Sequence, residues 1–369
     1  MAAAIGAAVL TASLLTAGAA DAAPPSPACV SNAGGTGLSA AVVAKAHQTI
    51  SNRTIRTNCD IGIYVGQGAT AVRIKHVTVS GAHYQGIFAE KTSHLLIDHS
   101  SVHGNGFQTV DPSAPALEGS GVHSYVGEAF GISLFGVSDS FIWDNSVYHN
   151  GRGGIGIMDN GANDPGLNTK TASQNKSAPL ISSTNDVITG NRMWGNYTGC
   201  GLVAATQNLG GSLSNLVLSN NTITGTGLSK TRGPDVGGLI VAANTPGSKV
   251  SNVSVSGNKV TGSAEGGIVV NAEAPTSPAG AGAATSNVWI TNNTVTRNNL
   301  FGLTPEPKTT VGVVVFSGGP GATNTGTVVA QNRISQQNYG IWSNGSTTPT
   351  TLFNQISVTR GGTDIYHQG

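Results

Sequence analysis

The stretch Val-Ser-Val-Ser-Gly-Asn-Lys-Val, residues 253–260, decides the fold because its pattern recurs along most of the chain. It reads apolar-x-apolar-x-x-Asn-x-apolar, which is two short strand-like runs joined at an asparagine. A repeat of this kind determines the architecture before any single residue can be weighed. The asparagine of this frame recurs at Asn145, Asn191, Asn221, Asn258, Asn293, Asn332 and, one residue short, Asn354.

A Gly-Ile-like step marks another strand of the repeat. Neighbouring frame asparagines lie from 22 residues (Asn332 to Asn354) to 46 residues (Asn145 to Asn191) apart, so we interpret the shortest interval as one bare coil and the others as coils with loops. Short alternating runs punctuated by Gly and Asn exclude helical repeats. The steps are Gly62-Ile63, Gly86-Ile87, Gly131-Ile132, Gly154-Ile155, Gly199-Cys200, Gly238-Leu239, Gly267-Ile268, Gly312-Val313, Gly340-Ile341 and a degenerate Asp364-Ile365.

These coils are expected to stack as a parallel β-helix. Strands of neighbouring coils would lie roughly 4.8 Å apart, so about ten coils make a rod about 50 Å long. Each frame asparagine would lie over the one before it. An amide carries two donors and two acceptors, so the stack predicts a buried asparagine ladder.

With this repeat, the chain resembles the right-handed parallel β-helix proteins of the pectate-lyase-like superfamily over about residues 50–366. The resemblance implies an all-β, single-stranded right-handed parallel β-helix of about ten coils. The superfamily includes lyases, hydrolases, epimerases, tail spikes and passive surface proteins. Leu96-Ile97-Asp98-His99 resembles part of a pectate-lyase signature, whereas the catalytic motifs of polygalacturonases and alginate epimerases are not found.

The composition fits this fold and argues against both disorder and nucleic-acid binding. Only 9% of residues are charged, against about 25% in ordinary soluble domains, and 52 of 369 residues are glycine. Disorder is not expected, since the chain is 38% hydrophobic with a net charge of +1. Because lysine and arginine do not cluster, nucleic acid is not expected as a partner.

The N-terminus predicts export. Residues 1–23 form an Ala/Leu/Val run ending in Ala20-Asp21-Ala22, which is typical of a secretory signal peptide, so we expect a secreted or periplasmic protein. No other stretch approaches 18 apolar residues, and no membrane span is expected. Export permits a disulfide, and we expect one between Cys29 and Cys59. Cys200 is expected to be a core thiol.

Residues 24–49 are predicted to form an N-terminal segment and cap, and residues 50–369 the β-helix domain. An open solenoid end exposes strand edges and needs a cover. Residues 38–47, Leu-Ser-Ala-Ala-Val-Val-Ala-Lys-Ala-His, have the pattern of a short amphipathic helix with Ser39 at its N-cap. We therefore expect a short capping helix there.

Two insertions interrupt the repeat, at about residues 106–130 and 159–181, and function on a repeat scaffold is carried where the repeat is broken. The first enters before one Gly-Ile strand and the second leaves after the next, so they would flank a groove. Ten of the 17 Asp and Glu residues lie between residues 90 and 186, and six of the nine His between 83 and 149.

We predict a site between these insertions. Phe135 would point outward and stack on a sugar ring, and Glu128 with Asp159 would form a carboxylate pair. The alternative is that the charges only pin the loops to the rod. The candidate catalytic residues are Glu118, His123, Glu128 and Asp159, and the candidate substrate-binding residues are Arg152, Phe135, Trp143 and Asp164.

A second group of titratable residues has a simpler interpretation. His76, His99 and Asp144 share one frame position, directly before the ladder site. Other coils place Gly190, Asn220, Gly257 and Asn292 there. All four residue types tolerate a positive φ, so we interpret the position as a left-handed turn rather than as a catalytic His–Asp pair.

These features favour a secreted carbohydrate-active enzyme that acts on a polysaccharide or oligosaccharide. A glycoside hydrolase with a carboxylate pair and no cofactor is slightly preferred. A uronate lyase or epimerase stays open, and it would need a cation, with Ca²⁺ as one candidate. A non-catalytic surface or sugar-binding rod also stays open.

Overall fold

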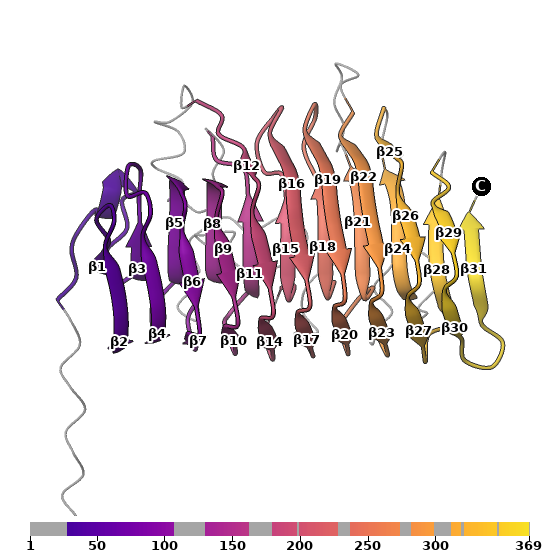
Figure 1. The fold of residues 1–369 in the computed structure, drawn as a ribbon, viewed down its shortest axis with the longest axis horizontal. Helices are drawn as coiled ribbons and strands as arrows, with labels where there is room; N and C mark the ends of the chain where they lie inside the picture. Colours follow the sequence, from indigo (N-terminus) through magenta and orange to yellow (C-terminus); the bar gives the residue numbers. More distant parts are fainter. Residues whose placement is uncertain are drawn as a thin grey trace, which may run out of the picture.

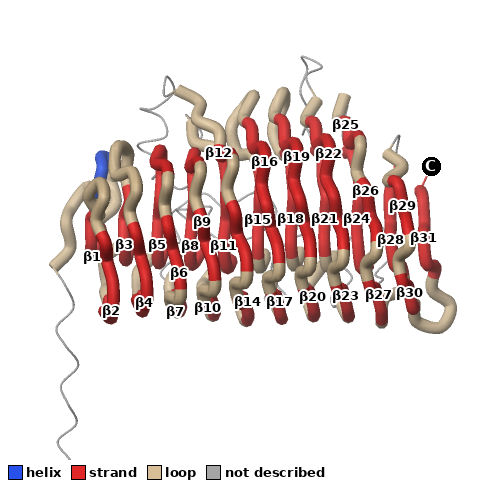
Figure 2. Tube along the Cα trace, in the orientation of Figure 1, coloured by secondary structure: helices blue, strands red, loops and turns tan. Residues whose placement is uncertain are grey.

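The computed structural model describes residues 28–106, 130–161, 179–197, 199–227, 237–273, 282–298, 311–318, 321–344 and 347–368. Over these ranges the chain winds into coils stacked along one axis, and strand β31 (Thr363–Gln368) ends the rod (Figure 1). Strands and short turns make up almost all of it (Figure 2). The single helical element in the described ranges is the 3-10 turn η1 (Ala33–Gly35), and none of these residues forms a helix able to cross a membrane.

The Gly-Ile steps form one parallel sheet, which we name sheet A. Ile132 pairs in register with Ile87 on one side and with Ile155 on the other. A Cβ on Gly131 would lie 2.5 Å from Val147, so the step needs glycine where the coil closes on itself. Sheet A consists of β1 (Ala40–Val43), β3 (Ile61–Val65), β5 (Gln85–Ser93), β8 (Phe130–Ser138), β11 (Gly153–Met158), β15 (Leu202–Ala205), β18 (Leu239–Ala243), β21 (Ile268–Glu273), β24 (Val311–Gly318), β28 (Tyr339–Asn344) and β31.

The runs on either side of the ladder position form sheets B and C. Sheet B, before the asparagine, holds β6 (Leu96–Asp98), β9 (Phe141–Trp143), β13 (Val187–Thr189), β16 (Ser212–Ser219), β19 (Lys249–Ser256), β22 (Ala284–Thr291), β26 (Val328–Ala330) and β29 (Thr350–Leu352). Sheet C, after it, holds β7 (Ser101–His103), β10 (Ser146–Tyr148), β14 (Arg192–Trp194), β17 (Thr222–Thr224), β20 (Lys259–Thr261), β23 (Thr294–Thr296), β27 (Arg333–Ser335) and β30 (Gln355–Ser357). Strands β2 (Thr49–Arg56) and β4 (Arg73–Ser80) run through both sheets. Strands β12 (Ser183–Thr184) and β25 (Thr323–Thr325) pair in parallel with the first residues of β16 and β22.

The predicted asparagine ladder is present and buried. From Asn191 to Asn354, each side-chain oxygen accepts a hydrogen bond from the backbone N–H and the amide of the previous member, and Asn145 Oδ1 accepts one from Ser100 N–H. The inward apolar residues beside it fill the solenoid interior as one continuous core. The repeat therefore predicted the architecture that the structure shows.

The strand register corrects one step of the repeat. Leu202, and not Cys200, pairs with Ile155 on one side and Leu239 on the other, so the glycine of this coil is Gly201. Cys200 is buried and forms no disulfide, in agreement with its expected role as a core thiol. It packs in a second apolar cluster on the outer side of sheet A rather than in the solenoid interior.

The predicted N-terminal helix is wrong. Residues 40–43 form strand β1, in which Ala40 pairs with Ile61 and Val42 with Ile63. The edge of β3 offers unpaired backbone groups, and pairing with them outweighs the modest helix propensity of an Ala-Val run. A short antiparallel bridge from Val30 to Ala40 covers β1 in turn.

The predicted disulfide is confirmed. Cys29 and Cys59 are bonded with Cα atoms 5.6 Å apart. The bond ties the segment before β1 to the residue just before Asp60 and β3. The N-terminal end of the rod is thus closed by a covalent link as well as by strand pairing.

Candidate functional site

The predicted groove between the insertions lies mostly outside the described residues. Glu118, His123, Glu128 and Asp164 fall in residues 107–129 and 162–178, so their convergence stays a prediction. Strand β8 begins at Phe130, and an antiparallel bridge joins Asn160 to Ile181.

Asp159 is fully buried and holds backbone in place. Its carboxylate accepts hydrogen bonds from the backbone N–H of Gln207 at 2.6 Å and of Asn208 at 3.1 Å. Burial raises the pKa of Asp159, and these hydrogen bonds oppose the rise. These contacts give Asp159 a structural role, and its predicted pairing with Glu128 remains untested.

The prediction that Phe135 stacks on a sugar is wrong. Phe135 lies on the outer side of sheet A, as the alternation indicates, but its side chain is 0% exposed. It packs edge-on against Phe88, with ring centroids 5.5 Å apart. A ring buried in this cluster has no free face for a ligand. Arg152, half-buried just before β11, keeps its predicted role untested.

Trp143 lies beside a cluster of titratable residues on sheet B. The indole is half-buried and lies edge-on to the imidazole of His99 at 4.5 Å between centroids. His99 belongs to the frame position directly before the ladder. The left-handed conformation predicted there is confirmed, with φ of 52° at His76, 47° at His99 and 53° at Asp144.

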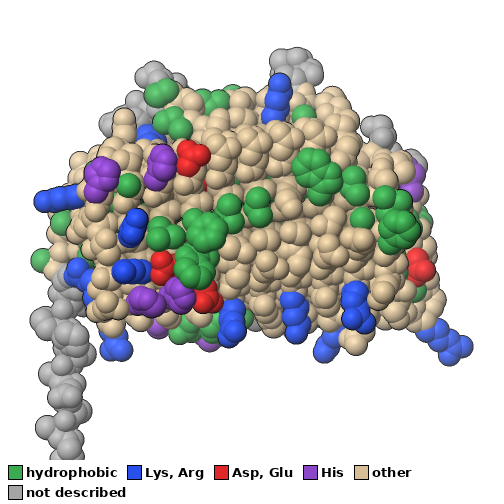
Figure 3. All heavy atoms as spheres, viewed as in Figure 1, with side chains coloured by type: hydrophobic (Ala, Val, Ile, Leu, Met, Phe, Trp, Pro, Cys, Tyr) green, Lys and Arg blue, Asp and Glu red, His purple; other side chains and the backbone are tan. Residues whose placement is uncertain are grey.

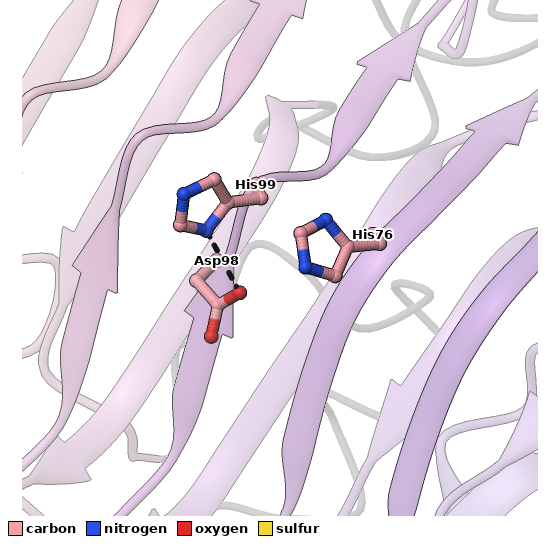
Figure 4. Close-up of side chains that lie close together, drawn as sticks. All are labelled: His76, Asp98 and His99. Carbon is pink, nitrogen blue, oxygen red and sulfur yellow. Dashed lines mark hydrogen bonds and ion pairs between the residues drawn. The ribbon is translucent and has the colours of Figure 1, made fainter.

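The side chains at this frame position also form close His–Asp contacts, which the interpretation as a turn did not predict. His99 Nδ1 lies 3.1 Å from Asp98 Oδ1, and His99 Nε2 lies 3.2 Å from Asp144 Oδ2. The imidazole of His76 lies one coil away, tilted by 36° to that of His99 with 5.0 Å between ring centroids. Figure 4 shows His76, Asp98 and His99 converging from neighbouring strands. We name His76, Asp98, His99 and Asp144 the His–Asp cluster.

The members of this cluster differ in access to solvent. The side chain of Asp98 is 8% exposed, whereas those of His99 and Asp144 are 36% and 54% exposed. Asp98 thus lies behind His99 and orients it, while Asp144 faces outward. The cluster borders an open surface depression of about 460 Å³, which we name the site depression; it is lined by His76, His99, Ser100, Ser101, Asp144, Ser146, Tyr148 and Trp194.

Two rings of an aromatic column, those of Tyr148 and Trp194, line the site depression. On sheet C, Tyr148 stacks on His103 at 4.8 Å and on Trp194 at 4.2 Å, with nearly parallel planes. The pKa of His103 is lowered by its burial, with His149 and Arg56 adding to the effect. We name His103, Tyr148 and Trp194 the aromatic stack.

The sequence held a signal for this stack. His103, Tyr148 and Trp194 all lie three residues after the ladder position of their coils, at Ser100, Asn145 and Asn191. Reading that frame position across coils would have found them. Figure 3 shows that His and acidic side chains gather near the N-terminal end of the visible face, while later coils carry mostly uncharged surface.

Comparison with known proteins establishes the family. A model of the right-handed β-helix region matches residues 30–208 and 127–279. The chain belongs to the right-handed β-helix family. No curated protein sequence matches it.

Solved structures of right-handed β-helix proteins share the fold at low identity. The surface protein and adhesin PfbA of Streptococcus pneumoniae is 12% identical with a TM-score of 0.53, over 90% of both chains. An exopolygalacturonase of Thermotoga maritima is 13% identical with a TM-score of 0.46, over 81% of this chain and 53% of its own. The chain therefore spans about half the length of that enzyme. The likeness to PfbA shows the fold alone.

Proposed function

We propose that this protein is a carbohydrate-active enzyme that binds a polysaccharide or oligosaccharide in the site depression. The supporting observation is the convergence of an acid–base group and an aromatic column in neighbouring coils. Asp144 lines the site depression with an exposed carboxylate, held at one oxygen by His99. Aromatic faces pack against sugar rings, and a positioned proton donor or acceptor is what glycosidic chemistry needs.

The roles follow from position. Asp144 is the group that exchanges a proton with the substrate, and His99, oriented by Asp98, fixes the Asp144 carboxylate. Trp194 ends the aromatic stack, because its in-register neighbour on the next strand is Thr224. Threonine is much smaller than an indole, so the outer part of the Trp194 face is open to a sugar ring on that side.

Hydrolysis of a glycosidic bond remains the preferred reaction. It needs a second carboxylate across the bond. Within the described residues, the other carboxylate of the cluster is Asp98, which His99 screens from the depression. Glu118 and Glu128 therefore stay the predicted sources of that second group.

A row of cations supports uronate elimination as the second candidate. Arg192 is exposed and pairs in register with Ser146 of the site depression. Lys259 and Arg333 follow at the same register in alternate coils. Two strand spacings separate them by about 10 Å. Such a row suits a chain of sugar carboxylates, whose neutralisation is what proton abstraction next to a carboxylate needs.

The test is incubation with a panel of neutral and uronate polysaccharides, with two product measurements. Hydrolysis is expected to give reducing ends alone, and elimination to give unsaturated uronates that absorb in the ultraviolet. Binding without either product would contradict both hydrolysis and elimination and support a sugar-binding rod. Neither binding nor turnover across the panel would overturn both.

Asp144→Asn tests the assigned residue. Asparagine keeps the shape and tolerates the turn, since Asn220 and Asn292 occupy the same position with φ of 55° and 57°. We expect kcat/KM to fall about 10²–10⁴-fold while the urea unfolding midpoint stays unchanged. The matched control is Asp139→Asn, because Asp139 also has a left-handed backbone, with φ 53°, and does not line the depression. Equal losses in both variants would exclude Asp144 as the acid–base residue.

A further inference from the structure

Both ring nitrogens of His99 face carboxylate oxygens. Asp98 Oδ1 lies 3.1 Å from Nδ1 and Asp144 Oδ2 lies 3.2 Å from Nε2. A neutral imidazole donates from one nitrogen only, and its other nitrogen presents a lone pair. In one tautomer Nδ1–H is donated to Asp98 and the Nε2 lone pair faces the exposed Asp144 carboxylate. In the other, Nε2–H is donated to Asp144 and the Nδ1 lone pair faces Asp98, which leaves room for a cation between Nδ1 and that carboxylate.

His76 supplies a third donor on the Asp98 side. One of its ring nitrogens is turned toward the Asp98 carboxylate (Figure 4). One donor atom from each of His76, Asp98 and His99 lies within 4.8 Å of the others. The His76 ring makes no hydrogen bond or ion pair with the part of the chain that the structure describes, so its nitrogens are not committed there.

The nearest cation in register does not neutralise Asp98. Lys75 pairs with Asp98 between β4 and β6, but within the described ranges no ion pair joins them. The two imidazoles of His76 and His99 are therefore the nitrogen groups gathered beside this carboxylate. Two imidazole nitrogens and one carboxylate oxygen form a donor set typical of zinc and related divalent transition metals, whereas calcium and magnesium prefer oxygen alone.

The geometry points to a divalent transition-metal site in which His76, Asp98 Oδ1 and His99 Nδ1 are the ligands. Asp144 accepts the Nε2–H of His99 and thereby positions that ligand, an arrangement found around most metal-bound histidines. Ligands held at roughly 2.1 Å in tetrahedral geometry lie about 3.4 Å from one another, so the three donors need only small side-chain rotations to close on an ion.

This site remains accessible from the depression. His76 and His99 are both exposed, which leaves a coordination position for water or for a sugar oxygen. Metal binding goes beyond the proposed activity on glycans and does not depend on it, because the ligand set is complete without a substrate.

Titration of the untagged full-length protein with Zn²⁺ by calorimetry tests the site, and Co²⁺ absorption reports the coordination geometry. We expect one ion per chain. His76→Asn and His99→Asn should each weaken binding at least tenfold, and both should fold, because Asn220 and Asn292 show that asparagine fits this turn. The matched control, His94→Asn, changes an exposed histidine with φ 56° and should bind as the wild type does.

A second variant separates a built site from surface histidines. Asp144→Asn removes the charge that orients His99, and loss of such a partner weakens metal affinity about 10–100-fold. Trp194→Ala should leave Zn²⁺ affinity unchanged while weakening sugar binding, so failure of the metal site and failure of the glycan proposal are distinguishable. Absence of stoichiometric Zn²⁺ binding, or an equal loss in His94→Asn, would overturn the metal site.

Discussion

Asn221 shows what a single ladder residue contributes. Its Oδ1 accepts hydrogen bonds from the backbone N–H and the amide of Asn191, and its own amide donates to Ile188 O and Asn258 Oδ1. In Asn221→Ala these buried groups lose partners at about 1–3 kcal/mol each. We expect the free energy of unfolding to fall by roughly 2–5 kcal/mol, measured by urea denaturation, with glycan turnover retained.

The matched control is Asn215→Gly. Asn215 belongs to an exposed asparagine row, where it donates to Asn185 at 3.0 Å and accepts from Asn252 at 3.2 Å. Glycine fits its φ of 56°, so removal of the amide should cost about 1 kcal/mol or less. If both variants lost the same stability, burial of the inner ladder would not be what stabilises the coils.

Asp186 makes stability depend on pH. It lies one coil before buried Leu216, inside the solenoid, and accepts a hydrogen bond from Ser140 N–H at 2.9 Å. Burial, opposed by that hydrogen bond and reinforced by Asp139, raises the pKa of Asp186 to about 8. The folded state then binds more protons than the unfolded state between about pH 4 and 8, so stability falls as pH rises through this window. The raised pKa of Asp159 acts in the same direction.

Asp186→Asn should remove most of this dependence. We expect the urea unfolding midpoint of the variant to rise relative to that of the wild type as the pH increases from about 5 to about 9. A constant difference across that range would show that Asp186 stays ionised in the folded protein.

At the scale of elements, sheet C carries the proposed sugar platform. Trp194 packs on Tyr148 with planes 5° apart, and its other side faces a threonine. Trp194→Ala should weaken oligosaccharide affinity about tenfold, which corresponds to the upper range for an aromatic contact. The control is Trp289→Ala, since Trp289 is 40% exposed on β22, several coils away from the depression. Fluorescence or calorimetric titration measures both, and equal losses would place the sugar elsewhere.

Element type could be predicted only where the repeat determines it. The Gly-Ile and asparagine frames specify strands because each coil repeats its neighbour. Residues 38–47 lie before the first full repeat, and an Ala-Val run suits helix or strand. What decided for β1 was the open edge of β3, which is visible only once the coils are stacked. The step at Cys200 failed similarly, because two Gly-apolar pairs, Gly199-Cys200 and Gly201-Leu202, lie two residues apart.

At the scale of the whole molecule, titratable groups gather where successive coils place their side chains at the same frame position. His76, His99 and Asp144 were predicted to be left-handed turns, and they are. A turn position repeated at every coil also stacks its side chains in space, so the backbone and the chemical interpretations hold together. The sequence predicts that His76, His99 and Asp144 share one frame position. It does not predict that the Asp98 carboxylate contacts His99, because that contact depends on three-dimensional packing.

The most direct test of the proposed site is a crystal structure of the Asp144→Asn variant with an oligosaccharide of the polymer that the wild type processes. The account predicts a sugar ring against the outer face of Trp194, with the scissile oxygen within about 3.2 Å of the side chain at position 144. A sugar bound instead over the outer side of β8 and β11, away from the His–Asp cluster, would contradict it.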